Sequence, residues 1–345
     1  MLNYKVEKNS AFLLTDRVDR MYFSGKDIAE GYLVFGEKKA YFSDYRYHLD
    51  TQKYFKNTEF QALPFLSIQD IKAFIQSNKI EKLYINFDKV SLSEYESFKT
   101  FGVEIKNGVD IINELRSIKS QEEISYIKRA CEVAQKAYHK SIRQVRLGMT
   151  EIELKDIIEE NICKQGCDIG FETIVAFAKG TAVPHHQTGK TRLRENQPIL
   201  VDMGAKYKGY ISDLTRMAFF GKPSEKFLRV YESVLKANQT AEEQICVGME
   251  YRVADSIARC QLAKDNLDKY FTHSLGHGVG LEVHENIVLS PKANGKIQEN
   301  MVFTVEPGVY LDNQFGVRIE DTVQVKDGKV QRLFTDEKKL IIIKR

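Results

Sequence analysis

"VDMGAKYKGYISDLTR", residues 201–216, is the stretch that decides the fold of the larger part of this chain. Two largely apolar runs flank the polar segment KYKG, which is typical of a β-hairpin with a tight turn. Asp202 and Asp213 have their midpoint between residues 207 and 208, inside that turn. The pattern therefore predicts that the two aspartates face each other across the hairpin, with Cβ atoms about 5 Å apart.

A second hairpin with the same design is predicted in "EPGVYLDNQFGVRIED", residues 306–321. Glu306 and Glu320 have their midpoint at residue 313, inside the turn-like DNQFG. Like charges that face each other destabilise a sheet, and acids within apolar runs are costly without cations. One such pair is usually a solvated coincidence. Two pairs predict a divalent metal centre.

Histidines gather in "HSLGHGVGLEVHE", residues 273–285, which holds three of the seven histidines of the chain. A glycine-rich loop would explain any one of His273, His277 and His284. Three of them together with four acids point to chemistry. Four carboxylates and one imidazole suit Mn²⁺, Co²⁺, Fe²⁺ or Zn²⁺. Two such ions, about 3.5–4 Å apart, can share bridging carboxylates and activate a water.

The order of predicted elements divides the chain in two. Residues 1–118 alternate short strand-like and helical runs, which predicts a compact α/β domain. Capping-box patterns at Ser120 and Thr150 then open two helices, and strand-like runs follow. The same order, two helices and then two strands, begins again at Ser224. We therefore predict that residues 119–345 form one α/β (α+β) domain of two similar ααββ halves.

Composition excludes several classes of partner. The formal net charge is +3, from 51 basic and 48 acidic residues, so neither nucleic acid nor a membrane surface is expected as a partner. No apolar run is long enough to cross a bilayer. The first twenty residues carry charges throughout and have no apolar core, so we expect no signal peptide and a cytoplasmic protein.

Cysteine usage agrees with this expectation. Five cysteines are an odd number, which argues against a disulfide framework. Cys163 and Cys167 have no second Cys/His pair at zinc-site spacing. Their i, i+4 spacing instead predicts two packing residues on one helix.

The ordered set of acids with His277 resembles the five-ligand signature of the "pita-bread" metallopeptidases. These include methionine aminopeptidase, aminopeptidase P, prolidase and the related hydrolase creatinase. The phrases VDMGAKYKGYISDLTR, HSLGHGVGLEVHE, FTVEPGVYL and GVRIEDTV match in order and spacing, over about residues 119–340. The N-terminal phrase MYFSGKDIAEGYLVFGEKKAYFSDYRY is similar to the creatinase-type N-terminal domain, which methionine aminopeptidase lacks. The resemblance is therefore to the Xaa-Pro peptidase branch.

The resemblance implies metal ligands, and it assigns them to Asp202, Asp213, His277, Glu306 and Glu320. Asp202 would bind one ion through both oxygens. Asp213 and Glu320 would bridge the two ions, and His277 with Glu306 would complete the second. The ions would be Mn²⁺ first, with Co²⁺, Zn²⁺ and Fe²⁺ as alternatives.

It also implies helpers that do not bind metal. His273 and His284 would hydrogen-bond the substrate and the developing oxyanion. His185, in AVPHH, matches an upstream histidine that lines the family's site, and we expect His186 to be only its neighbour. Thr215 and Arg318 lie two residues from bridging acids and would orient them.

The function implied is hydrolysis of the bond between an N-terminal residue and a following proline, in a homodimer. A metal-activated water would attack the carbonyl, and Glu306 would carry its proton to the leaving nitrogen. A creatinase-like hydrolase is an alternative, because a fold does not determine a substrate. A binding module that has lost catalysis is another, but such relatives lose metal ligands and this chain keeps all five. A serine route lacks the G-x-S-x-G signature.

Substrate length is where the chain departs from one relative. Prolidases often carry an arginine four residues after the histidine equivalent to His284, and it pairs with the carboxylate of the dipeptide. Here the run is HENIV and the position is Val288. We therefore predict an Xaa-Pro aminopeptidase, with an Xaa-Pro dipeptidase (prolidase) as the alternative.

Overall fold

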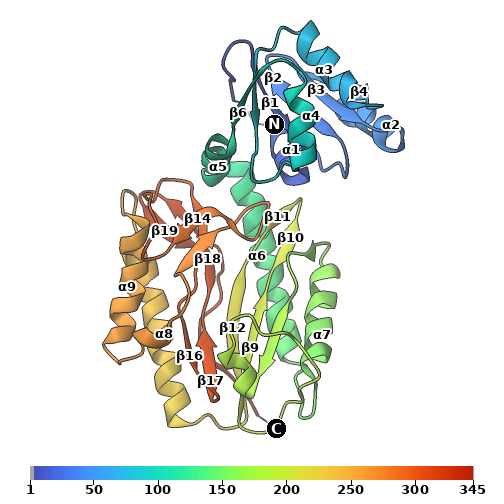
Figure 1. The fold of residues 1–345 in the computed structure, drawn as a ribbon. Helices are drawn as coiled ribbons and strands as arrows, with labels where there is room; N and C mark the ends of the chain where they lie inside the picture. The colour runs from blue at the N-terminus through green and yellow to red at the C-terminus, as the bar shows by residue number, and fades with distance from the viewer. Residues whose placement is uncertain (1–3, 345) are drawn as a thin grey trace. The chain divides into compact units, whose positions relative to one another are not determined.

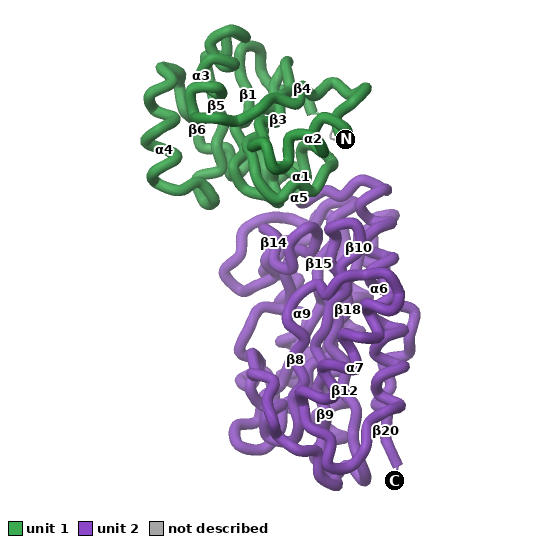
Figure 2. The backbone as a smooth tube through the Cα atoms, turned by 90° about the vertical axis from the view of Figure 1, so that its right-hand side faces the viewer, with its two compact units in different colours: residues 1–116 green, residues 117–345 purple. Residues whose placement is uncertain are grey.

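The computed structural model describes residues 4–344. Residues 1–3, which begin the segment considered for a signal peptide, and residue 345 lie outside the described residues. The chain divides into two compact units, residues 1–116 and 117–345 (Figure 2). Within the described residues, no helix has both the length and the apolar character needed to cross a bilayer.

Unit 1 is built on a six-stranded sheet in the order β4-β3-β2-β1-β5-β6. Side chains alternate along a strand, so successive residues of β1, inside this sheet, point to opposite faces. Ala11 and Leu13 belong to one apolar cluster, and Phe12 and Leu14 belong to another on the opposite face. The strands are β1 Ser10–Leu14, β2 Tyr32–Gly36, β3 Lys39–Ser43, β4 Phe60–Pro64, β5 Lys82–Ile85 and β6 Glu104–Asn107. The helices are α1 Arg17–Ser24, α2 Tyr45–Phe55, α3 Ile68–Ser77, α4 Leu92–Lys99 and α5 Val109–Ser117.

The first half of unit 2 begins with two capped helices. Ser120 and Thr150 each accept a backbone N–H three residues on, so both predicted capping boxes are confirmed. The helices are α6 Gln121–Ile142 and α7 Glu151–Cys163. The strands are β7 Asp168–Ile169, β8 Ile174–Phe177, β9 Gln197–Met203, β10 Ala205–Tyr207, β11 Tyr210–Ile211 and β12 Leu214–Phe220.

The second half repeats the order of two helices followed by strands, as predicted. Figure 1 shows the strands of both halves between the α6–α7 pair and the α8–α9 pair. The helices are α8 Glu225–Gln244 and α9 Tyr251–Ala263. The strands are β13 Gly276–Gly278, β14 Glu285–Leu289, β15 Val302–Val305, β16 Gly308–Leu311, β17 Phe315–Arg318, β18 Asp321–Lys326, β19 Lys329–Arg332 and β20 Ile341–Ile343.

The first hairpin forms, but its predicted register is wrong. Asp202 pairs with Thr215, not with Asp213. The reason is the turn, where Lys208 and Gly209 have φ values of 48° and 88°. Two consecutive positive φ values make a two-residue turn whose twist matches the strands, and this turn is centred one residue later than predicted. Asp213 is therefore a diagonal neighbour of Asp202 on the same face.

The second hairpin has the predicted register. Gly308 pairs with Arg318 in the β16–β17 ladder, and Val305 pairs with Asp321 in the β15–β18 ladder. Both ladders share one register, so Glu306 and Glu320 face each other in the short gap between them. The gap contains Pro307, whose missing N–H cannot contribute to a ladder.

The cysteine prediction also needs correction. Helix α7 ends at Cys163, which is exposed, and Cys167 is buried beyond the helix. Gly166 adopts a φ of 76° between them, a conformation that commonly ends helices. The two cysteines therefore do not share a helical face.

Candidate metal centre

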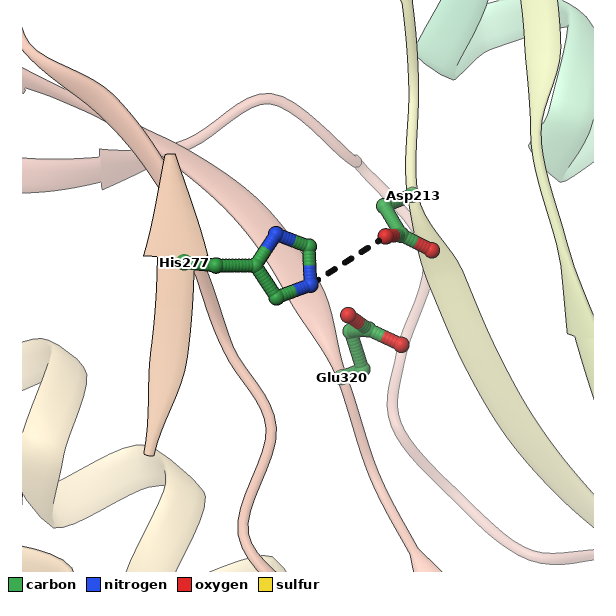
Figure 3. Close-up of side chains that lie close together, drawn as sticks. All are labelled: Asp213, His277 and Glu320. Atoms are coloured by element: carbon green, nitrogen blue, oxygen red, sulfur yellow. Dashed lines mark ion pairs between the residues drawn. The ribbon is translucent and has the colours of Figure 1, made fainter. Parts of the chain in front are cut away.

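Three residues from distant parts of unit 2 bring their side chains together. Asp213 precedes β12, His277 lies in β13 and Glu320 precedes β18. One possible ligand atom from each lies within 4.8 Å of the other two. Figure 3 shows the His277 ring directed at Asp213, with His277 Nε2 3.6 Å from Asp213 Oδ2. This is the compact mixture of imidazole and carboxylate that holds divalent ions.

The other two predicted ligands adjoin this cluster. Glu306 Oε1 lies 3.4 Å from His277 Nε2. Asp202 is close enough to Asp213 and Glu320 that its charge raises the pKa of both. Asp202 Oδ1 is buried and has no hydrogen-bond partner among the described residues. A buried carboxylate oxygen that lacks a hydrogen-bond partner and lies near other acids fits a site that holds cations.

Burial makes the acid cluster electrostatically expensive. Burial and the Asp202 charge raise the pKa of Glu320 to about 8. Burial and the charge of Glu320 raise the pKa of Asp213 and that of Glu306 well above their usual range. Burial lowers the pKa of His277 to about 4, so its imidazole is neutral near pH 7 and keeps a free lone pair. Divalent cations would neutralise the acids and accept that lone pair.

Thr215 and Arg318 contact the acids directly. Arg318 Nη2 donates to Asp202 Oδ2 at 2.6 Å, and Arg318 Nε donates to Thr215 Oγ1 at 2.9 Å. Thr215 Oγ1 donates in turn to Glu320 Oε2 at 2.6 Å. One buried chain of hydrogen bonds therefore links acids of the two hairpins.

His273 lies beside the cluster with a partner that the sequence analysis missed. Its Nδ1 is 3.9 Å from Glu306 Oε2, and its Nε2 is 2.8 Å from the Tyr310 hydroxyl. That hydroxyl also accepts from Arg318 Nη1 at 3.0 Å. Burial lowers the pKa of His273 to about 4 and raises that of Tyr310 to about 12. The register of the second hairpin contained a signal for Tyr310, because it puts this side chain on the Arg318 face.

His284 and His185 lie on the exposed side of the centre. The ring centroids of His284 and His277 are 4.3 Å apart, yet His284 is exposed. His185 is exposed too, in the loop after the 3₁₀-helix Ala178–Ala182. Burial raises the pKa of Asp202, and the charges of Arg318, His185 and His284 oppose that rise. Both histidines are therefore near the acids while remaining accessible.

His186 is more than a neighbour, which corrects the prediction made for it. Its Nε2 lies 3.0 Å from Oε2 of Glu151, a wholly buried acid in the first turn of α7. No role was predicted for Glu151, because it lies 35 residues from His186 along the chain.

Comparison with known proteins agrees with this geometry. Residues 125–327 match the sequence model of metallopeptidase family M24. The chain belongs to metallopeptidase family M24. It is therefore a metallopeptidase that uses metal ions, and the family resemblance seen in its sequence is confirmed.

Individual relatives of this M24 metallopeptidase match over nearly the whole chain. An Xaa-Pro dipeptidase of Pyrococcus furiosus is 34% identical, covering 98% of this chain and 99% of the relative. The crystal structure of an X-Pro aminopeptidase from Thermotoga maritima superposes with a TM-score of 0.91 at 31% identity, covering 97% of both chains. An Xaa-Pro dipeptidase structure from Bacillus anthracis gives 0.91 at 30% identity, covering 96% of this chain and 95% of that one. These matches confirm the pita-bread fold.

Proposed function

We propose that this M24 metallopeptidase is an Xaa-Pro peptidase, which hydrolyses the bond between an N-terminal residue and a following proline. The observation that carries the proposal is the convergence of His277 with four acids, of which Asp213 and Glu320 are buried and the other two are partly buried. The names of relatives that match over nearly the whole chain support the choice of substrate.

Two divalent ions would be held by Asp202, Asp213, His277, Glu306 and Glu320. When bound, such ions activate a water and polarise the scissile carbonyl. Mn²⁺ is the first choice, with Co²⁺, Zn²⁺ and Fe²⁺ as alternatives.

The remaining residues have roles that follow from their contacts. Arg318 and Thr215 fix the orientation of Asp202 and Glu320 through short hydrogen bonds. Glu306 moves a proton from the water to the leaving nitrogen. His273, which is partly buried, and the exposed His284 and His185 would hydrogen-bond the substrate and the developing oxyanion. Such donors become most effective once the bound substrate excludes water from the site.

The names of the matching relatives favour dipeptides as the class of substrate. Two of the three relatives described above are named dipeptidases, so the comparisons support the alternative better than the aminopeptidase activity that the sequence analysis preferred. We therefore propose Xaa-Pro dipeptidase activity first.

An Xaa-Pro aminopeptidase is the second candidate, and Val288 is the observation that favours it. Val288 pairs with His277 across β13 and β14, so the two side chains share a face of the sheet. It is 41% exposed and offers no donor for the carboxylate of a dipeptide. One X-Pro aminopeptidase is also among the matching structures.

One experiment tests the metal. Thorough chelation should abolish peptidase activity, and Mn²⁺ or Co²⁺ should restore it. Asp213→Asn and Glu320→Gln should lower bound metal, measured by elemental analysis, because both acids belong to the cluster that would hold the ions. Glu337→Gln removes an exposed carboxylate and is the control. Full activity in metal-free protein would exclude this function.

A second experiment tests substrate length. The measurement is kcat/KM for an Xaa-Pro dipeptide against the same sequence extended by one residue. A preference for the dipeptide supports the first candidate, and a preference for the longer peptide supports the second. Cleavage of methionyl peptides alone would contradict both.

A further inference from the structure

The loop that carries His185 has little structure of its own. It connects β8 to β9 and, after the short 3₁₀-helix, has no regular secondary structure from residue 183 to residue 196. A free segment of this kind would place an exposed histidine in many positions, and holding it in one costs conformational entropy. Contacts from outside the loop must therefore hold His185 in one position.

Glu151 reaches this loop from helix α7. Its Oε1 accepts from the backbone N–H of Phe177 at 2.9 Å, and its Oε2 accepts from that of Gly189 at 2.9 Å. His186 Nε2 lies 3.0 Å from the same Oε2. The three contacts lie before, beside and after His185 along the chain, so one carboxylate binds the end of β8, the residue next to the histidine and the middle of the loop.

The local environment suits a carboxylate at this position. Glu151 is wholly buried, and a buried charge is tolerated only when it is hydrogen-bonded. It lies in the first turn of α7, where the helix dipole favours an anion. The His186 ring also packs closely, since a Cβ added at Gly180 would lie 3.0 Å from its Cε1.

Pro184, which precedes His185, is held by Arg318, an arginine that also binds the acid cluster. Arg318 Nη1 donates to the backbone carbonyl of Pro184 at 3.3 Å, and the same guanidinium binds Asp202. The chain is therefore anchored on both sides of His185, to the acids through Pro184 and to α7 through His186.

We propose that Glu151 and His186 are positioning residues that hold His185 in the orientation from which it meets the substrate. The proposal rests on the proposed function, in which His185 hydrogen-bonds the substrate. Neither residue touches the substrate or the metal. Their effect is to order the loop before the substrate binds, which lowers the entropic part of the barrier.

The main test is a double-mutant cycle in the metal-loaded enzyme. Glu151→Gln should lower kcat/KM about tenfold to hundredfold, as expected when a catalytic group is misplaced by about 1 Å. Bound metal should stay unchanged. In a His185→Ala background the same substitution should have little further effect, because the group that it positions is gone.

Glu160→Gln is the matched control, because it removes an exposed carboxylate from the same helix. It should leave kcat/KM unchanged in both backgrounds. The proposal is overturned if Glu151→Gln leaves kcat/KM unchanged, or if its effect multiplies fully with that of His185→Ala. A His185→Ala variant with normal kcat/KM would also overturn it, while metal-dependent peptidase activity would remain.

Two further readouts do not depend on catalysis. In the metal-free protein, amide hydrogen exchange at Phe177 and Gly189 should be faster in Glu151→Gln, since each N–H loses a charged acceptor. His186→Gln keeps a donor near Glu151 and should retain more kcat/KM than His186→Leu, which has none. Unchanged exchange at both amides, or equal activity of the two His186 variants, would overturn the proposal.

Discussion

His277 and His284 have rings in contact, but their surroundings give them different roles. His277 faces Asp213 and Glu306, whereas His284 is exposed. We expect His277→Ala to lose metal from at least one site. His284→Ala should keep its metal while turnover falls about 10²- to 10³-fold, the usual cost of losing an oxyanion donor. Metal stoichiometry by elemental analysis would decide, and the reverse pattern would show that the ligand assignment is wrong.

Val288 allows a gain of function at the residue scale. Val288→Arg should place a guanidinium on the face that carries His277, where it can bind the carboxylate of an Xaa-Pro dipeptide. A charged hydrogen bond contributes about 1.5–3 kcal/mol, or roughly ten- to hundredfold in kcat/KM for the dipeptide. An extended peptide should gain little. Val288→Met is the control for side-chain size, and an equal gain on both substrates would contradict the expectation.

Residue types and their order indicated the four acids and a histidine cluster, and the family resemblance selected His277 among the histidines, but neither revealed the groups that hold these side chains. Acids within apolar runs are anomalous in any sequence, so Asp202 and Glu306 were visible without a structure. The sequence around Tyr310 and Glu151 has no unusual pattern, because a buried tyrosine and an acid in the first turn of a helix are both common. Their roles depend on contacts across 37 and 35 residues, which only the tertiary fold creates.

At the scale of elements, the two hairpins explain why one register was predicted and the other was not. The second hairpin is symmetric about residue 313, and two separate ladders hold the same register. In the first, the register depends on Lys208 adopting a positive φ, which a lysine rarely does. Turn chemistry, not apolar patterning, therefore determined the alignment of Asp202 and Asp213.

Helices α7 and α9 occupy equivalent places in the two halves, and each has a buried acid that binds a histidine-bearing segment. Asp255, on α9, accepts from the backbone N–H of Leu275 at 3.1 Å. Arg259 binds the same acid and donates to the backbone carbonyl of His273 at 2.6 Å. The repeated helices thus anchor both chain segments that carry the non-ligand histidines His185 and His273.

Strand β13 approaches β15 so closely that it needs a glycine. A Cβ on Gly276 would lie 1.8 Å from the backbone carbonyl oxygen of Thr304, which cannot move without shifting β15. We expect Gly276→Ala to cost about 3 kcal/mol or more of stability and to displace His277. Thermal unfolding of the metal-free protein and its Mn²⁺ affinity would measure both effects. A normal melting temperature together with normal affinity would contradict this account of the strand.

At the scale of the whole molecule, every candidate ligand and helper lies in unit 2. The assignment of residues 1–118 and 119–345 to a creatinase-type domain and a catalytic domain remains our proposal, as does a homodimer. Within unit 2, the C-terminal segment adds an edge strand to the sheet, where β20 pairs with the last residues of β12, Ala218 with Ile341. The end of the chain therefore stabilises the strand that carries Thr215.

A buried ionic network joins that segment to the acid cluster. Arg216 Nη2 binds Asp321 Oδ1 at 2.7 Å and Asp336 Oδ1 at 2.9 Å. The Arg216 guanidinium also donates to the backbone carbonyls of Thr215 and Glu320. The network therefore fixes the backbone of Glu320, one of the candidate ligands.

This network predicts how stability depends on pH. Burial alone would raise the pKa of Asp336, but hydrogen bonds from His139 and Arg216 and the charges of Arg216 and Arg332 lower it below its ordinary 3.8. A lowered folded-state pKa contributes stability that is present above the unfolded pKa and is lost as pH falls toward the folded one. Asp336→Asn should therefore cost about 3 kcal/mol near pH 7, since Arg216 keeps Asp321 as a partner.

The stability lost in Asp336→Asn should be constant down to about pH 5 and should shrink below about pH 4. In that range Asp336 becomes protonated in the unfolded chain while it stays ionised in the folded protein, which lowers the stability of the unsubstituted protein. Urea unfolding of the metal-free protein and the variant, followed by circular dichroism across this range, measures the difference. Titrating groups far from Asp336 cancel between the two proteins, so the shrinking gap reports on Asp336 together with the groups that contact it, His139, Arg216 and Arg332. A gap that stays constant or widens on acidification would show that Asp336 is not held ionised by Arg216 in the folded protein.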